Sequence, residues 1–300
     1  MSKYINVASV MFDRALLREP KRETILKWSK NVLTSLEGYG LDLIVFSEAM
    51  IYAQTLKQAE KLDKPGKLLN IYMAFAKKEK CHVVGAFRCT KNGKIYNSLA
   101  YIGPDGSLLN AYHKVNITIG AIEKGETSGS SAVVVDTDIG RLGGIICFDL
   151  NFEYLRKEYR ALQPDILCFA SMYHGGLMQE VWAYDCRSFF ISALPFHGCG
   201  ILDPFGRPLK LADCYTSVPM AKINLDRVIV HLDFNREKFT EIEKKYSGEI
   251  IIDIPPNIGA ALIYSLSEKR SAMDVVREFE LELLDNYFDR SLKANITNRA

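Results

Sequence analysis

The 300-residue sequence lacks the features that mark several large classes of protein. Its seven cysteines are an odd number without any Cys-x-x-Cys pair, which argues against a disulfide framework and against a zinc finger. No stretch approaches the roughly 20 consecutive apolar residues of a membrane-spanning helix, and the N-terminus does not read as a secretory signal. A formal net charge of +2 gives no electrostatic reason to bind nucleic acid. We therefore expect a cytoplasmic protein with no membrane, nucleic-acid or metal partner.

The chain does contain the material of a large soluble domain. Its hydrophobic content of 48% and charged content of 25% are ordinary for a globular protein. Apolar, β-branched runs alternate with segments of helical period, and hairpins turning at 91–94 and 103–106 interrupt the alternation. Because no repeat or linker divides the chain, we expect one domain over residues 1–300, built as a layered α/β sandwich.

Three polar side chains lie at the predicted ends of buried strands. Glu48 follows the apolar run 41–46, Lys114 ends the strand that begins at 107, and Cys147 ends a glycine-rich run. Each alone has a structural interpretation: a rim carboxylate, an exposed edge lysine and a buried packing cysteine. Together they form a catalytic set, because a thiol can attack, a carboxylate can move its proton and a lysine can stabilise developing negative charge. The predicted strand-to-helix turn at Cys147 also implies a lowered thiol pKa and backbone N–H groups for an oxyanion.

The segments around these residues resemble the nitrilase, or carbon–nitrogen hydrolase, superfamily, whose members carry a Glu–Lys–Cys triad in this chain order. The similar segments are IVFSEAM, YNSLAYIGPDGSLLNAYHKVN and GRLGGIICFDLNF. The resemblance implies that Glu48 is the general base and Cys147 the nucleophile, and that Lys114 and the backbone N–H of Phe148 stabilise the oxyanion. No cofactor is implied.

The resemblance also implies a second glutamate after the lysine, which orients the substrate or assists proton transfer. Glu123 is the first candidate and Glu126 the second. The implied fold is an α-β-β-α four-layer sandwich. A C-terminal arm, about residues 267–300, is expected to pack on a partner subunit in a homodimer or larger homo-oligomer.

Departures from the family pattern bear on the substrate. Ser47 stands where the family commonly has a proline before its glutamate. Asn151 stands where many members have an arginine that helps carboxylate-bearing substrates bind, and an asparagine cannot supply that guanidinium fork. Tyr173 and His174 are further candidates for substrate contacts, with a structural histidine as the alternative at 174. Trp182 and Phe196 are candidates for lining a pocket or for the core.

The implied activity is hydrolysis of a non-peptide C–N bond in a small-molecule substrate. The first candidate is a linear amide, which gives an acid and ammonia through a thioester on Cys147. The alternatives are an N-carbamoyl amine or amino acid hydrolase and a nitrilase. A cysteine-dependent acyltransferase and a catalytically silent binding protein of the same fold are more distant alternatives. The stretch CFDLNF is closer to amidase-like members than to the Cys-Trp-Glu of nitrilases.

Overall fold

The computed structural model describes residues 3–195 and 198–299. The chain divides into two compact units, a larger one of residues 6–222 and a smaller one of residues 223–299 together with the N-terminal residues 3–5. All the segments predicted to form the site lie in the larger unit. The boundary at 223 falls well before residue 267, where the C-terminal arm was expected to begin. Packing of that arm on a partner subunit stays a prediction.

The first sheet of the larger unit has six strands in the order β12-β1-β2-β3-β4-β5. The strands are β1 (Tyr4–Val10), β2 (Leu43–Phe46), β3 (His82–Lys91), β4 (Lys94–Ile102), β5 (Leu108–His113) and β12 (Met220–Asn224). Strands β1, β2 and β3 are parallel, while β3, β4 and β5 form the antiparallel meander predicted from the turns at 91–94 and 103–106.

The second sheet also has six strands, in the order β11-β10-β9-β8-β7-β6. The strands are β6 (Val134–Thr137), β7 (Gly140–Ile146), β8 (Ile166–Ala170), β9 (Phe189–Ala193), β10 (Gly200–Leu202) and β11 (Pro208–Leu211). Its central strands β7, β8 and β9 are parallel and end on the same edge, which is where functional side chains gather in α/β folds.

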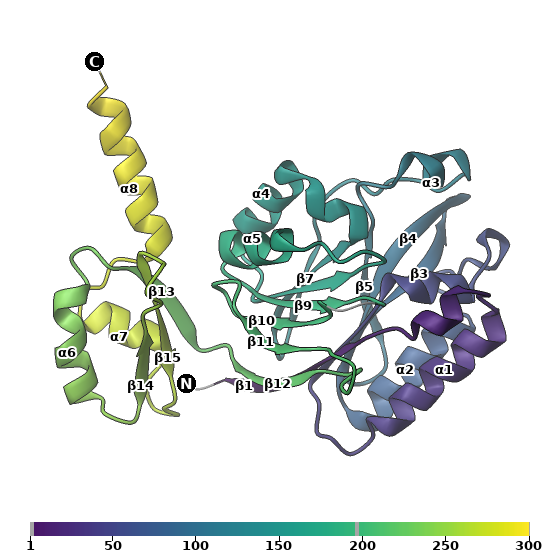
Figure 1. Ribbon diagram of the computed structural model, residues 1–300, viewed down its shortest axis with the longest axis horizontal. Helices are drawn as coiled ribbons and strands as arrows, with labels where there is room; N and C mark the ends of the chain where they lie inside the picture. Colours follow the sequence, from purple (N-terminus) through teal and green to yellow (C-terminus); the bar gives the residue numbers. More distant parts are fainter. Residues whose placement is uncertain (1–2, 196–197, 300) are drawn as a thin grey trace. The chain divides into compact units, whose positions relative to one another are not determined.

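The two sheets pack face to face between two layers of helices (Figure 1). Helices α1 (Arg22–Ser35) and α2 (Lys67–Glu79) cover the first sheet, and α4 (Glu153–Leu162) and α5 (Leu177–Cys186) cover the second. Between the sheets, Ser9 of β1 donates to the Ser192 carbonyl of β9 at 2.5 Å, and a Cβ at Gly144 of β7 would collide with the Tyr101 hydroxyl of β4. The α-β-β-α sandwich expected from the sequence is confirmed.

Short helices occupy the loops at the strand ends. They are the 3-10 turns η1 (Arg14–Leu17), η2 (Glu48–Ala53), η3 (Leu56–Gln58) and η4 (Cys147–Asn151), and the helix α3 (Ile119–Glu123). Two of them, η2 and η4, begin directly on predicted catalytic residues.

The smaller unit has its own sheet and core. Strands β13 (Arg227–His231), β15 (Ala260–Ser265) and β14 (Ile250–Asp253) pair antiparallel in that order, with helices α6 (Arg236–Lys245), α7 (Ala272–Glu278) and α8 (Leu284–Thr297). Helices α7 and α8 are separated by a break after Glu278: Glu280 has a φ of 47°, and the Lys238 ammonium donates to the carbonyls of 279 and 280. Within residues 3–195 and 198–299, no helix has the length and apolar character needed to span a membrane.

Candidate active site

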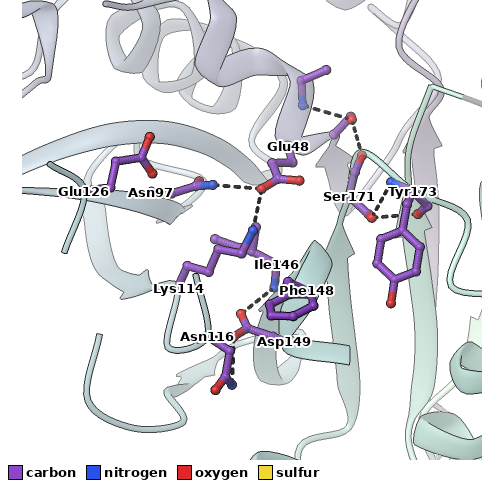
Figure 2. Close-up of polar contacts among 12 residues, drawn as sticks. Glu48, Asn97, Lys114, Asn116, Glu126, Ile146, Phe148, Asp149, Ser171 and Tyr173 are labelled. Carbon is purple, nitrogen blue, oxygen red and sulfur yellow. Dashed lines mark hydrogen bonds and ion pairs between the residues drawn. The ribbon is translucent and has the colours of Figure 1, made fainter. Parts of the chain in front are cut away.

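The buried strand β2 carries Glu48 into the space between the sheets. All four residues of β2 are buried, and the chain then turns at Ser47, whose hydroxyl oxygen accepts from the Ala49 N–H at 3.1 Å. The same hydroxyl donates to the Ser171 carbonyl at 2.9 Å, at the end of β8 (Figure 2). This residue, which replaces the family's proline, ties the Glu48 turn to the second sheet. The Glu48 side chain is only 5% exposed.

Lys114 follows β5, the edge strand of the first sheet, and its side chain meets Glu48. Its ammonium lies 2.8 Å from Glu48 Oε1, and the Asn97 side-chain amide donates to the same oxygen at 2.8 Å. Burial lowers the pKa of Lys114, but the negative charge of Glu48, helped by Cys147, outweighs it and leaves that pKa raised. The other carboxylate oxygen, Glu48 Oε2, is buried without a hydrogen-bond partner among the described residues. Glu48 Oε1 therefore already accepts two hydrogen bonds, and Oε2 is available to accept a proton.

Cys147 sits in a strained turn at the end of β7. Its φ of 49° is in the left-handed region, which a residue with a Cβ adopts only when its surroundings hold it there. Asp149 provides that support, because one carboxylate oxygen accepts from the Ile146 N–H at 3.1 Å and from the Tyr112 hydroxyl at 2.8 Å. The other accepts from the Asn116 N–H at 2.7 Å (Figure 2). The turn holds Cys147 close enough to Glu48 and Lys114 for both charges to affect the pKa of its thiol.

The pKa of the Cys147 thiol is raised to about 11, and the lowered pKa predicted from the sequence is wrong. Burial is the first cause and the negative charge of Glu48 the second, and the Lys114 cation only partly offsets them. The helix N-terminus on which that prediction rested is a short 3-10 turn. Cys147 is therefore a neutral thiol at neutral pH that needs a base to remove its proton.

Asp149 is the residue of the site that sequence reasoning missed. It is fully buried, and burial raises its pKa to about 6 against the opposing effect of its hydrogen bonds from Asn116 and Tyr112. Its position two residues after the predicted nucleophile was the available signal, because a carboxylate there can accept the N–H groups of a tight turn.

The two candidates for the second carboxylate lie in different surroundings. Glu123 ends α3 with its side chain exposed, whereas the Glu126 side chain is 8% exposed and pairs with Arg88 of β3. Figure 2 shows Glu126 on the side of Asn97 that faces away from Lys114. The structure therefore puts the second candidate, Glu126, with the buried residues and leaves the first candidate outside.

The predicted substrate contacts divide into two groups. Asn151 and Tyr173 lie together near Cys147. Burial raises the pKa of the Tyr173 hydroxyl, and a hydrogen bond with the Asn151 side chain lowers that pKa in part. Asn151 also donates to the Phe148 carbonyl at 3.1 Å. His174 is exposed, and its Nδ1 accepts from the Gly176 N–H at 3.0 Å, as a loop-stabilising histidine would.

Three further predicted residues are Trp182, Phe148 and Phe196. Trp182 is fully buried and donates to the Leu150 carbonyl at 2.8 Å, so it belongs to the core rather than to a pocket wall. Phe148 follows the nucleophile, and its exposed ring has its centroid 5.2 Å from that of the Phe152 ring. The oxyanion role of the Phe148 N–H stays a prediction. Phe196 lies outside the described residues. In the described part of the chain, no group of three or more His, Cys, Asp or Glu could hold a metal ion.

Comparison with known proteins gives a family match and several relatives. The carbon-nitrogen hydrolase family profile matches residues 6–230. The chloroplastic omega-amidase of Arabidopsis thaliana is 26% identical over 173 residues, 48% of this chain and 47% of that protein, so the match spans about half of that relative. Human omega-amidase NIT2 is 26% identical over 221 residues, 65% of this chain and 73% of that protein.

Solved structures show the same fold. Nit3 of Saccharomyces cerevisiae, a member of the nitrilase superfamily, has a TM-score of 0.64 at 18% identity and covers 82% of this chain and 95% of its own. A mutant of the Nesterenkonia AN1 amidase, also of that superfamily, has a TM-score of 0.64 at 13% identity and covers 82% and 97%. With a family match over three quarters of its length and the fold of these structures, the chain belongs to the carbon-nitrogen hydrolase family.

Proposed function

We propose that this protein hydrolyses a small linear amide to an acid and ammonia through a thioester on Cys147. The observation that carries the proposal is the buried Lys114–Glu48 ion pair at 2.8 Å. Glu48 Oε2 has no hydrogen-bond partner among the described residues, and the charges of both residues affect the pKa of the Cys147 thiol. Membership of the carbon-nitrogen hydrolase family and the omega-amidase relatives support an amide as the substrate.

The first half-reaction begins with a proton transfer. Because the Cys147 thiol is neutral at neutral pH, Glu48 takes its proton as the sulfur attacks the amide carbon, and Oε2 is the oxygen available for it. The carbonyl electrons move onto oxygen, where the Lys114 ammonium and the Phe148 N–H stabilise the oxyanion. Glu48 then protonates the amide nitrogen and the C–N bond breaks. Ammonia departs, and the acyl group remains on Cys147 as a thioester.

The second half-reaction uses the same groups in reverse. Glu48 takes a proton from water as the water oxygen attacks the thioester carbon, and Lys114 again holds the oxyanion. The C–S bond then breaks, the sulfur regains its proton from Glu48, and the carboxylic acid departs. No step needs a metal or an organic cofactor.

Glu126 serves as the second carboxylate in place of Glu123. Its side chain is buried, whereas that of Glu123 is exposed, and its partner Arg88 lies directly across the sheet from Asn97. A carboxylate in that position can orient the substrate amide or the attacking water.

The substrate carries a neutral acyl group. Asn151 presents an amide, not a guanidinium, at the position where a carboxylate-binding arginine is common, and it lies beside the Tyr173 hydroxyl. An N-carbamoyl amine without a carboxylate is the second candidate, because the same amide and hydroxyl can bind its urea group. Homo-oligomerisation and a cytoplasmic location stay predictions.

Ammonia release across a panel of substrates tests the proposal. The panel compares short neutral amides, ω-amides of dicarboxylates, N-carbamoyl amines and matched nitriles, with Cys147→Ala as the inactive variant. Cys214→Ala, which changes an exposed cysteine, is the matched control. We expect neutral amides to be hydrolysed fastest, by the wild type and the control only. Faster ammonia release from nitriles, or full amide turnover by Cys147→Ala, would overturn the proposal.

A further inference from the structure

A second buried ion pair lies beside the proposed catalytic pair. The Arg88 guanidinium of β3 contacts Oε1 of Glu126, which follows α3, and the two side chains are only 13% and 8% exposed. Charged groups this deeply buried are costly unless they are paired. None of the proposed proton transfers uses the Arg88–Glu126 pair, so the pair has a different role.

The sheet register places Arg88 next to the base. In the antiparallel ladder of β3 and β4, Arg88 is directly opposite Asn97, so the two side chains leave the same face of the sheet. Asn97 in turn donates to Glu48 Oε1 at 2.8 Å (Figure 2). The Arg88 backbone N–H donates to the Gln54 side chain at 2.6 Å, and Gln54 directly follows the turn that begins with Glu48.

The charges of the two pairs therefore form a connected group. Lys114 and Arg88 supply two cations, and Glu48 and Glu126 supply two anions, while the thiol of Cys147 lies against the first pair. If Arg88 lost its charge, Glu126 would be a buried carboxylate without its cation, beside the strand pair in which Asn97 donates to Glu48. Like charges in a shared low-dielectric site make each other harder to ionise.

We propose that Arg88 is a positioning residue that holds Glu126 in place as a carboxylate and so prevents it from competing with Glu48 for protons and for Lys114. This inference rests on the proposed roles of Glu48 and Cys147. Arg88 touches neither the substrate nor the reacting atoms; it acts through the charge and the position of Glu126.

The test compares Arg88→Gln, Arg88→Lys and the double variant Arg88→Gln/Glu126→Gln with the wild type. The first readout is the pH dependence of kcat/KM for a neutral amide. We expect Arg88→Gln to move the acid limb upward by about one pH unit or more, because an uncompensated carboxylate disfavours ionisation of Glu48. Arg88→Lys keeps the cation and should hold the limb in place. The double variant removes both charges and should return the limb to the wild-type position, even if kcat falls.

The second readout needs no substrate. Alkylation of Cys147 by iodoacetamide at pH 9, followed by peptide mass spectrometry, should be at least about threefold slower in Arg88→Gln and should recover in the double variant, because added negative charge disfavours the thiolate. Thermal unfolding of the same variants separates an effect of charge from an effect on folding. The double variant loses the Arg88–Glu126 contact just as Arg88→Gln does, so an effect on folding should persist in it.

The outcomes distinguish this inference from the proposed function. If the wild type hydrolyses amides but Arg88→Gln leaves both profiles unmoved, or the double variant shares its shift, Arg88 is merely structural and the inference is overturned. If no amide is hydrolysed but the alkylation rates follow the expected pattern, the proposed function fails and the electrostatic role of Arg88 stands.

Discussion

Replacing Glu48 by glutamine should change two rates at Cys147 in opposite directions. Glutamine keeps an oxygen that can accept from Lys114 and Asn97, which now bond to Glu48 Oε1 at 2.8 Å, so the local geometry is preserved. It removes the negative charge that raises the pKa of the Cys147 thiol and leaves the Lys114 cation that lowers it. It also removes the proposed proton acceptor.

The magnitudes follow from the thiol pKa of about 11. At that pKa about one thiol in a thousand is ionised at pH 8. Removing a neighbouring charge shifts a pKa by about 1–3 units. Each unit by which the pKa falls gives about tenfold more thiolate. Because a less basic thiolate is a weaker nucleophile, the rate of alkylation rises by only about threefold per unit. Alkylation of Cys147 should therefore accelerate by about 3-fold to about 30-fold.

Amide hydrolysis should fall in the same variant by about 10²-fold to 10⁴-fold, the usual contribution of a general acid–base group. The assay measures both rates at pH 8 on one preparation, ammonia release by a coupled enzyme and alkylation of Cys147 by peptide mass spectrometry. Alkylation of the exposed Cys214 is the internal control and should not change. Parallel loss of both rates would show that the substitution disrupts the site, and an unchanged hydrolysis rate would refute Glu48 as the base.

Three further substitutions test the supports of the site. Lys114→Met should lower kcat by at least about 10²-fold through loss of oxyanion stabilisation, and it should cost about 3–5 kcal/mol in the free energy of unfolding because Glu48 is left buried without its cation. The Asp149 carboxyl, whose pKa is raised to about 6 in the folded state, binds its proton more tightly there than in the unfolded chain. Its contribution to stability is thus greatest below about pH 4 and is lost as the pH rises through 6. Urea unfolding should therefore show the wild type losing about 2 kcal/mol between pH 4 and 7 relative to Asp149→Asn; a pH-independent difference would contradict this. Ser47→Ala should cost about 1–2 kcal/mol, seen as a lower midpoint in thermal unfolding, since it removes the 2.9 Å bond to Ser171 and the cap on η2; an unchanged midpoint would mean that neither bond matters.

The sequence was most informative where a local pattern decides the outcome. Glu48, Lys114 and Cys147 each follow an apolar or alternating run, so their position at strand ends could be predicted from the residues, and the family resemblance supplied their grouping. The alternation of strands and helices predicted a layered α/β sandwich, and the family resemblance supplied its four layers. The structure brings Glu48 and Lys114 to 2.8 Å although 66 positions separate them.

The properties that could not be predicted depend on packing between distant segments. The direction of the Cys147 pKa shift is set by burial and by Glu48, neither of which is visible in the residues around the cysteine. Which of Glu123 and Glu126 turns inward depends on the loop after α3 and on Arg88, more than 30 positions earlier. Local periodicity likewise could not show that the helical run after 271 breaks at Glu280, because Lys238 of α6 holds that break.

The most direct measurement is the intact mass of the protein quenched during turnover of a neutral amide. The mechanism predicts an acyl-sized mass increase that maps to Cys147, appears in the wild type and is absent in Cys147→Ala, which should also release no ammonia. Ammonia release by Cys147→Ala at the wild-type rate, or an acyl group on a different residue, would contradict the central role of this thiol.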